Sequence, residues 1–430
     1  MTEERKSFFG RNEFVTHVLT LMTGSGLGQL IALLLAPIVT RFYSAEEFAT
    51  LEQFAMLLAV LAVFSTGKYE FAIMLPKKEE NARVLGVLSM RIAVIFSAVM
   101  LVVLLFTRHY IADAYKNPEL ADWILLLPLA IMGFAIFNTL NYWFSRREKY
   151  VVAATSKTLN SVVSEPSKIA LGLPNLGGGG LVLGIVLGRI VSSIYMIGRF
   201  LKHEPRGFRG IDREERKEMA RKYRDYPMYT TWGSALGRLA QWAHIFLFSY
   251  FFGLWAVGFF ALTRRVVQNP LNIIAGSYGQ VFYQRISKIE RELQLRKFYM
   301  KNLLLFGSAA AAMVLAVQML PTQTMGFVFG EKWAESIDFL KILVFWYALN
   351  FVSGSLSFIN HKLQKQKQMF VLDALHFIMI CAAIIVSYRA GNDALTTLEW
   401  FVIAKVIFFL INIAASVFFV FQTPIPSNDE

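Results

Sequence analysis

Basic side chains stand inside several of the long apolar runs of this sequence, where a lone charge is expelled from hydrocarbon. On insertion scales a basic residue at the membrane centre costs about 2.5–3.5 kcal/mol, so these side chains must face a hydrated cavity or meet an anion. Arginine predominates, and its planar guanidinium offers paired donors to paired oxygens, which suits phosphate or pyrophosphate. The deepest positions in the predicted spans are Arg189, Arg238, Arg264, Arg265, Lys168 and Lys405.

A second group of cations lies nearer the predicted helix ends. Lys68, Arg91 and Lys157 fall within about two turns of the basic ends of their spans, where long side chains can reach the interface. Their charges can therefore remain hydrated at little cost.

One predicted helix carries a continuous polar face. Its members follow the i, i+3, i+4, i+7, i+11 pattern of a single helix face, and they are Lys157, Asn160, Ser161, Ser164 and Lys168. Glu165 stands at the edge of this face, three residues before Lys168. Such spacing allows an ion pair, so a purely structural role for Lys168 remains open beside a role in binding.

Two further helices carry polar groups at depth. Arg264, Arg265, Gln268 and Asn272 share about one quadrant of a helix that Asn269-Pro270 interrupts, which predicts a bend. Arg238 shares a broader face with Gln241 and His244. A lone histidine on such a face is more often a packing residue than a proton carrier, and both readings of His244 stay open.

Acidic residues at depth are few. Glu70 and Glu165 are the clearest, and Asp373 and Glu399 lie close to span ends. The membrane interior is therefore net positive, and fixed positive charge in a cleft of low dielectric attracts anions and excludes free cations.

These residues are carried by a polytopic all-α membrane protein. The chain has 430 residues, 56% of them hydrophobic, and its mean hydropathy is +0.48. A membrane helix needs about 20 apolar residues, and the apolar runs predict about twelve transmembrane helices, at 15–40, 48–75, 84–107, 122–144, 151–173, 176–199, 228–252, 254–284, 300–321, 337–360, 369–388 and 398–421.

The loop charges set an orientation. The connectors on one side are rich in Lys and Arg, whereas those on the other side hold only Arg41, Arg108, Lys116, Lys332 and Arg389. By the positive-inside rule the basic side, with both termini, is cytoplasmic. This asymmetry also explains most of the net charge of +13, so nucleic acid is not an expected partner.

The longest polar stretch divides the chain in two. We expect an N-terminal six-helix lobe at 1–200, a basic cytoplasmic linker with an amphipathic helix at 201–227, and a C-terminal six-helix lobe at 228–430. Gly24-Ser25-Gly26-Leu27-Gly28-Gln29-Leu30 recurs as Gly233-Ser234-Ala235-Leu236-Gly237-Arg238-Leu239, which favours duplicated halves related by an axis along the membrane normal. Close helix packing alone also favours such small residues.

Motifs for chemistry are not found. The sequence has no P-loop, no HExxH metal motif and no Gly-x-Ser-x-Gly elbow, and Cys381 is its single cysteine. We expect no enzyme activity, no cofactor and no metal. The glycines from Gly177 to Gly180 are interpreted as a flexible turn between two spans.

Several motifs resemble those of bacterial O-antigen and polysaccharide flippases. They are Val39-Thr-Arg-Phe-Tyr-Ser-Ala-Glu-Glu-Phe48, Thr66-Gly-Lys-Tyr-Glu-Phe-Ala-Ile-Met-Leu-Pro-Lys-Lys-Glu-Glu80, Leu140-Asn-Tyr-Trp143 with Arg146-Arg147, Val257-Gly-Phe-Phe-Ala-Leu262 with Gln280-Val-Phe282, and Phe329-Gly-Glu-Lys-Trp333. The resemblance implies the multidrug/oligosaccharidyl-lipid/polysaccharide (MOP) superfamily, two six-helix lobes around a central cationic cleft, and residence in the bacterial inner membrane.

What the resemblance implies for function is a flippase. Its cargo would be an undecaprenyl-pyrophosphate-linked oligosaccharide, such as an O-antigen unit for lipopolysaccharide, moved from the cytoplasmic to the periplasmic leaflet by alternating access. Membrane lipids, a polysaccharide polymerase and chain-length proteins are the other implied partners.

Roles carried onto this sequence follow from that resemblance. Pyrophosphate contacts are expected from Arg238, Arg264, Arg265 and Arg189, and the access face from Arg91, Lys157 and Lys168. Lys68 and Glu70 are expected at the cytoplasmic end of the cleft, and pairing or titration between states is expected from Glu70, Glu165 and His244. A multidrug exporter of the same superfamily, which would need acids in the cleft, and a polysaccharide polymerase or ligase, which would present a large outer loop, are the alternatives.

Overall fold

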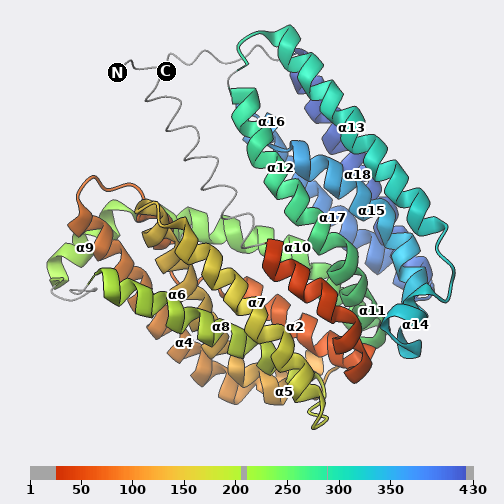
Figure 1. The fold of residues 1–430 in the computed structure, drawn as a ribbon, viewed down its shortest axis with the longest axis horizontal. Coiled ribbons are helices and arrows are strands. Elements are labelled where there is room, and N and C mark those ends of the chain that lie inside the picture. The colour runs from red at the N-terminus through yellow and green to blue at the C-terminus, as the bar shows by residue number, and fades with distance from the viewer. Residues whose placement is uncertain (1–25, 205–210, 288, 423–430) are drawn as a thin grey trace. The chain divides into compact units, whose positions relative to one another are not determined.

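The computed structural model describes residues 26–204, 211–287 and 289–422, and every regular element in these ranges is a helix (Figure 1). The predicted all-α architecture is confirmed. Residues 15–25 of the first predicted span, the first two residues of the predicted repeat and both termini lie outside the described residues.

The chain divides into two compact units, Met1–Ile245 and Phe246–Glu430. Helix α10 (Thr231–Phe252) contains the division point. The lobe boundaries at 200 and 228 and the cleft between the lobes stay predictions.

The N-terminal unit consists of long helices joined by short turns. In chain order its helices are Gly26–Phe42, α2 (Ala45–Leu61), α3 (Tyr69–Ala72), α4 (Glu79–Ala114), α5 (Leu120–Trp123), η1 (Ile124–Leu126), α6 (Leu127–Arg146), α7 (Tyr150–Gly172), α8 (Gly178–His203), α9 (Arg213–Lys222), η2 (Tyr226–Thr230) and the first part of α10.

The C-terminal unit is built in the same manner. Beyond the end of α10 it contains α11 (Leu254–Thr263), η3 (Arg264–Gln268), α12 (Asn269–Ser287), α13 (Glu292–Gln318), α14 (Thr324–Phe329), η4 (Glu331–Trp333), α15 (Ser336–Leu356), α16 (Phe358–Lys362), α17 (Gln366–Arg389) and α18 (Ala394–Gln422).

Seven helices in the described ranges are long and apolar enough to cross a membrane by length and composition. The other predicted spans coincide with helices that are interrupted, polar on one face, or described only in part: Gly26–Phe42, α2 with α3, α7, α10, and α11 with α12. Helix α4 has 36 residues, about 54 Å, well beyond a hydrocarbon core of about 30 Å. Arg91 lies about three turns from the start of this helix, and its distance from the membrane boundary stays a prediction.

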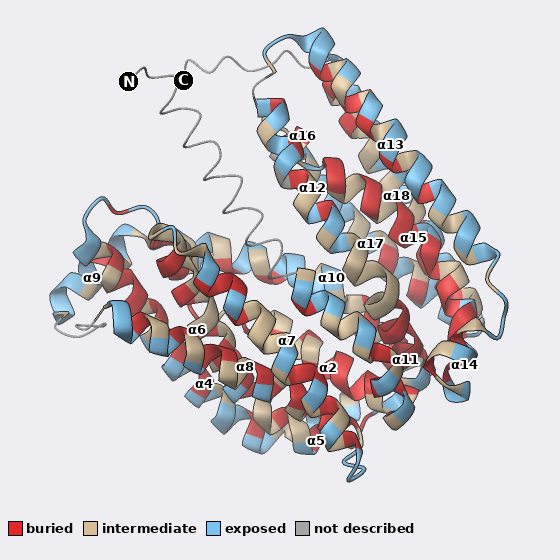
Figure 2. Ribbon diagram, in the orientation of Figure 1, coloured by how far each residue is buried: buried red, intermediate tan, exposed pale blue. Residues whose placement is uncertain are grey.

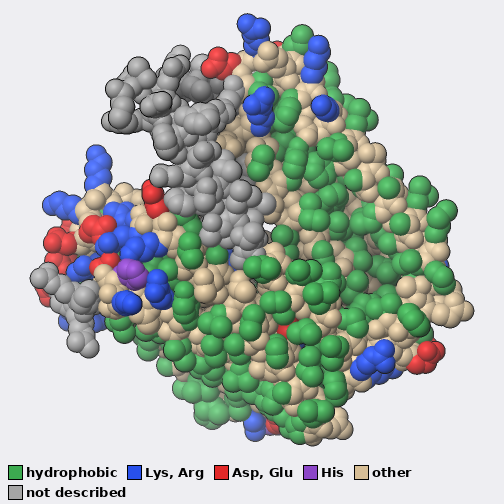
Figure 3. Space-filling view, viewed as in Figure 1, with side chains coloured by type: hydrophobic (Ala, Val, Ile, Leu, Met, Phe, Trp, Pro, Cys, Tyr) green, Lys and Arg blue, Asp and Glu red, His purple; other side chains and the backbone are tan. Residues whose placement is uncertain are grey.

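The surface facing away from each unit's core is apolar. On α4 the side chains of Val94, Ile95, Val99 and Phe106 are exposed, and hydrophobic side chains dominate the visible surface in Figure 3. A soluble protein rarely exposes contiguous apolar patches of this extent. The chain is a multi-pass membrane protein.

Helix ends of the N-terminal unit gather at two opposite poles. At one pole the amide of Asn117, after α4, donates to Thr50 Oγ1 (2.9 Å) and Gln53 Oε1 (2.7 Å) at the start of α2, and the backbone N–H of Gly179 in α8 donates to Glu119 Oε1 (3.3 Å). At the other, basic pole the guanidinium of Arg146 at the end of α6 donates to carbonyls of the segment between α3 and α4. This is the pattern of helices that pass back and forth.

The glycines at the start of α8 are packing residues, which corrects the expected flexible turn. Only Gly177 has a positive φ, +60°, whereas Gly178, Gly179 and Gly180 already belong to α8. A Cβ on Gly179 would overlap the indole of Trp123, and one on Gly180 would overlap the hydroxyl of Tyr43. The absence of side chains is what lets α8 begin inside the core.

Candidate functional site

Two consecutive residues with left-handed backbones lie within the Thr66-Gly-Lys-Tyr-Glu70 motif. Helix α2 ends at Leu61, turns fill residues 62–68, and α3 begins at Tyr69. Gly67 and Lys68 both have left-handed backbones, with φ of +57° and +59°. The left-handed conformation carries no steric penalty for glycine, whereas a residue with a Cβ loses about 1–2 kcal/mol of conformational free energy. A lysine held there against its preference suggests a position required for function.

Lys68 and Glu70 lie on either side of this break. The ammonium of Lys68 is 5.0 Å from the ring centroid of Phe71, and the side chain is half-buried. Glu70 is only 1% exposed, and its Oε2 has no hydrogen-bond partner among the described residues. The two charges interact electrostatically without forming an ion pair within the described ranges, as their i, i+2 spacing predicts.

The start of α10 brings Arg238 to the same place. Arg238 is exposed, its Nη1 donates to Gln241 Oε1 (3.0 Å), and it lies within electrostatic range of Lys68. The ring of Trp232, earlier on α10, packs edge-on against Phe64 in the turn segment, with 5.4 Å between centroids. Arg238, a predicted pyrophosphate ligand, thus lies within electrostatic range of Lys68 at the helix break, beside a buried carboxylate.

The glycines of this part of α10 are not packed against other described residues. Among residues 26–204, 211–287 and 289–422, no atom lies within 4 Å of a Cβ built on Gly233 or Gly237. The described residues therefore leave this surface of the helix that carries Arg238 uncovered. We call the group formed by Lys68, Glu70 and Arg238 the break site.

His244 lies further along α10 and is buried, with 3% exposure. Burial is compatible with the packing role as well as with proton binding, so its assignment stays a prediction.

The polar face of α7 packs inside the N-terminal unit along much of its length. Lys168 Nζ and Glu165 Oε1 form a buried ion pair of 2.7 Å, with side-chain exposures of 5% and 7%. Gly184 of α8 lies against Lys168, and Gly188 lies against the backbone of Asn160. The structural alternative for Lys168 is therefore realised, and a role in binding for this residue stays a prediction.

Lys157 and Arg189 occupy separate surroundings. Lys157 is half-buried one turn before Ser161, whose hydroxyl lies against Gly28 of the first helix. Arg189 on α8 has its guanidinium 5.6 Å from the ring centroid of Phe134 on α6.

Arg91 is exposed on α4 and lines a shallow groove of about 390 Å³. The other lining residues are apolar, namely Val87, Met90, Val94 and Ile95. A guanidinium within an apolar groove suits the boundary between a charged head group and an acyl chain.

In the C-terminal unit Arg264 and Arg265 begin a π-helical segment, η3. The backbone N–H of Asn269 donates to the carbonyl of Arg264, five residues earlier. Pro270 has no N–H with which to continue the helical hydrogen bonds. The predicted interruption is confirmed. Both arginines are half-buried, next to the buried residues 256–263 of α11 (Figure 2).

Two functional features were missed from the sequence. No contact of Arg146 or Arg147 was predicted, yet the guanidinium of Arg146 donates to the carbonyls of Ile73, Met74 and Pro76, and Arg147 contacts Glu79 (2.5 Å) and Glu204 (2.7 Å). The position of Arg146 and Arg147 shortly after the Leu140-Asn-Tyr-Trp143 motif is the sequence feature that could have indicated these contacts.

The second missed feature is the docking of α9. The hydroxyl of Tyr69, beside the break, donates to the carbonyl of Ala220 in α9 (3.2 Å), and Met219 of α9 is 4% exposed within the cluster that includes Tyr69. The predicted linker helix exists and is attached to the break site.

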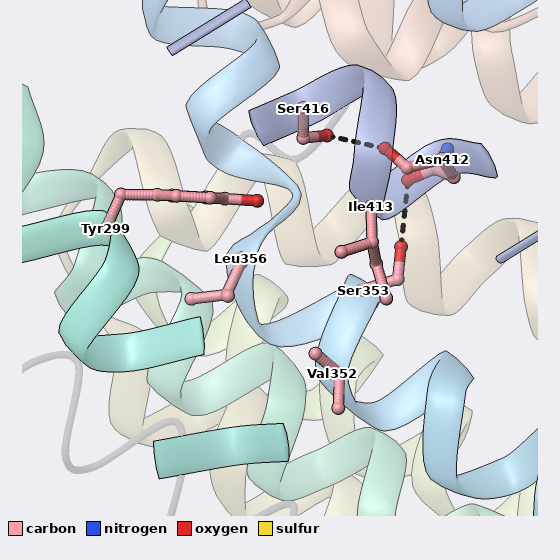
Figure 4. Close-up of a pocket in the computed structure, with 7 residues that line it drawn as sticks. All are labelled: Tyr299, Val352, Ser353, Leu356, Asn412, Ile413 and Ser416. Carbon is pink, nitrogen blue, oxygen red and sulfur yellow. Dashed lines mark hydrogen bonds between the residues drawn. The ribbon is translucent and has the colours of Figure 1, made fainter. Parts of the chain in front are cut away.

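A small polar cavity lies in the C-terminal unit. Asn412 on α18 lines one side of the cavity, and Tyr299 lies on the opposite side (Figure 4). The side-chain oxygen of Asn412 accepts a hydrogen bond from the hydroxyl of Ser353 (3.0 Å), and its backbone carbonyl accepts one from the hydroxyl of Ser416 (2.9 Å). Its volume of about 10 Å³ is enough for at most one water molecule. It is too small for cargo.

Comparisons with known proteins identify one family and several solved structures of similar fold. Residues 38–338 match the model of a family described as polysaccharide biosynthesis protein. No curated protein sequence matches the chain.

Solved structures share the fold over nearly the whole chain. The lipid II flippase MurJ in an inward closed conformation is 12% identical, with a TM-score of 0.72, covering 93% of this chain and 87% of that chain. A multidrug resistance MATE family transporter of the MOP superfamily, facing inward, is 13% identical, with a TM-score of 0.65 and coverage of 93% and 94%.

A MOP superfamily transporter from Pyrococcus furiosus, described as having a binding pocket of reverse polarity, is 14% identical, with a TM-score of 0.60 and coverage of 95% and 96%. At these identities the likeness concerns the fold alone. The family model spans more than half of the chain, and the chain therefore belongs to the family of polysaccharide biosynthesis proteins, built on the fold of MOP superfamily transporters.

Proposed function

We propose that this protein is a flippase for a polyprenyl-pyrophosphate-linked oligosaccharide, such as an O-antigen or related polysaccharide unit. The observation that carries the proposal is the break site, where Lys68 and Arg238 come within electrostatic range of each other. Two cations that repel one another are stabilised together when a polyanion binds between them.

Pyrophosphate matches this arrangement better than a single carboxylate. Its two phosphate groups offer oxygens to a guanidinium fork and to an ammonium point charge at once. Glu70 supplies the counter-charge when the cargo is absent, because it interacts electrostatically with Lys68. Arg189, Arg264 and Arg265 are the proposed further contacts, and Arg91, Lys157 and Lys168 the proposed access face.

Transport then needs a wet path for the head group and hydrocarbon for the tail. The cleft proposed between the lobes removes the desolvation barrier for the head group, and alternating access moves the site from one leaflet to the other. Two states that differ by only a few kcal/mol are sufficient for cargo to shift their populations. No step makes or breaks a covalent bond.

The proposed setting is the bacterial inner membrane, with both termini cytoplasmic and the cargo moving toward the periplasmic leaflet. A polysaccharide polymerase and chain-length proteins are the proposed downstream partners.

Purified protein in liposomes tests the proposal. The probe is a fluorescent polyprenyl-pyrophosphate disaccharide, and a membrane-impermeant quencher measures its exchange between leaflets. We expect exchange well above that of protein-free liposomes. Exchange no faster than in protein-free liposomes would refute the flippase.

The MATE-like fold favours one second candidate, a multidrug exporter. Cationic drugs need acidic residues, and in the break site Glu70 is outnumbered by Lys68 and Arg238. Drug resistance on expression, without exchange of the pyrophosphate lipid, would favour that candidate.

A further inference from the structure

A buried lysine occupies the middle of the last helix. Lys405 lies about 17 Å from the start of α18, at 1.5 Å per residue, and is 5% exposed. Its ammonium is 4.7 Å from the ring centroid of Trp346 and 5.3 Å from that of Phe401. Within the described ranges no carboxylate pairs with it. Aromatic faces stabilise a cation only in part.

A histidine shares this environment. The imidazole of His376 on α17 stacks on Phe408 of α18, with centroids 3.7 Å apart and an interplanar angle of 6°. Its Nε2 is buried and has no hydrogen-bond partner among the described residues. His376 also lies within electrostatic range of Lys405.

Other titratable groups around this pair are few. Helices α13, α15, α16 and α17 pack on α18. Cys381 on α17 is within electrostatic range of Lys405, and Asp373, one turn before His376, is exposed. On α15 the phenol of Tyr347 is a further titratable group, with its ring centroid 5.0 Å from that of Trp346.

Two neighbouring bases without a counter-ion cannot both hold a proton in an apolar interior, because each charge opposes the other and burial opposes both. One proton shared between them is the most that the site can stabilise. We propose that Lys405 and His376 form the proton-binding site through which a pH gradient drives cargo movement, a coupling that rests on the proposed flippase function.

The step itself is a simple exchange. A proton from one aqueous side binds the free amine of Lys405 or the imidazole of His376, forming an N–H bond, and the same bond breaks when the proton leaves toward the other side. No electron is transferred. If one proton accompanies each cargo molecule, a gradient of one pH unit can shift the leaflet distribution by up to about tenfold.

The experiment measures this distribution in proteoliposomes holding the full chain and the fluorescent lipid, with and without a gradient of one pH unit. The wild type is expected to shift the distribution by up to about tenfold, and Lys405→Met to restore an even distribution while exchange continues. Lys341→Met, a lysine on α15 outside this pair, is the matched control and keeps the shift. Exchange that stays even in the wild type under the gradient, or a shift retained in Lys405→Met, would overturn the coupling and leave the flippase standing.

A second experiment tests the proton-binding site independently of lipid exchange, and so remains informative if the protein is not a flippase. Intrinsic tryptophan fluorescence is titrated with pH in the wild type, in Lys405→Met and in Trp346→Phe. A transition carried by Trp346 that disappears in Lys405→Met supports the proton site whatever the cargo is. The same transition in both wild type and Lys405→Met contradicts it.

Discussion

At the scale of single residues, the backbone of Lys68 separates function from stability. Glycine adopts the left-handed conformation of Lys68, at φ +59°, without the steric penalty of a Cβ. Lys68→Gly is therefore expected to leave the thermal stability unchanged or to raise it by up to about 1 kcal/mol, while slowing lipid exchange. Thermal unfolding in detergent and the exchange assay measure the two effects. Lower stability with normal exchange would mean that the lysine is retained for folding.

The buried pair on α7 is expected to behave in the opposite way. Removing one partner leaves an uncompensated buried charge, so Lys168→Met or Glu165→Gln alone should cost about 3–5 kcal/mol. The double variant should recover much of that loss. Unfolding midpoints of the four proteins form the test, and additive losses would show that the 2.7 Å contact contributes little.

What the sequence could predict for individual residues was limited to helix phase and spacing. The i, i+3 relation of Glu165 and Lys168 indicated their pairing, and the i, i+2 relation of Lys68 and Glu70 indicated its absence. Spacing along one helix carries no information on contacts across the fold. For this reason the proximity of Lys68 and Arg238, 170 positions apart in the sequence, was not predicted.

At the scale of helices, the glycines of α8 set how closely α7 approaches. A Cβ on Gly188 would lie 2.6 Å from the carbonyl oxygen of Asn160, which is backbone and cannot turn aside. Gly188→Ala is expected to destabilise the N-terminal unit by about 1–3 kcal/mol. Gly198→Ala on the same helix is the matched control, since its Cβ meets nothing within 4 Å. Equal unfolding midpoints for the two variants would contradict this packing.

The helices themselves were largely predictable, but their interruptions were predictable only where proline marks them. Asn269-Pro270 indicated that the helix is interrupted between α11 and α12, although not that the interruption is the π segment η3. The break at Gly67 and Lys68 contains no proline, and an apolar run continues through it, so the sequence read as one span from 48 to 75. The start of α8 was misjudged for a related reason, because a glycine that packs and a glycine that turns look alike in a sequence.

At the scale of the whole molecule, the orientation rests on loop charge. In a variant whose Cys381 is replaced by serine, we expect an impermeant maleimide to label Lys116→Cys and Lys332→Cys in intact cells. Lys217→Cys and Lys297→Cys should react only after the membrane is opened. All four native lysines are exposed. The reverse labelling pattern would invert the assignment of the basic side and with it the proposed direction of transport.

The proposed flippase depends on recognition of a pyrophosphate head group by the break site. Lipid exchange rates for charged and neutral head groups test this recognition. Exchange rates are measured for the fluorescent pyrophosphate lipid and for the same lipid with a neutral head group, in the wild type and in the double variant Lys68→Met with Arg238→Met. We predict that the wild type exchanges the pyrophosphate lipid at least tenfold faster, about 1.4 kcal/mol of preference, and that the double variant loses this preference while remaining folded. An equal preference in both proteins would show that Lys68 and Arg238 do not recognise the pyrophosphate head group.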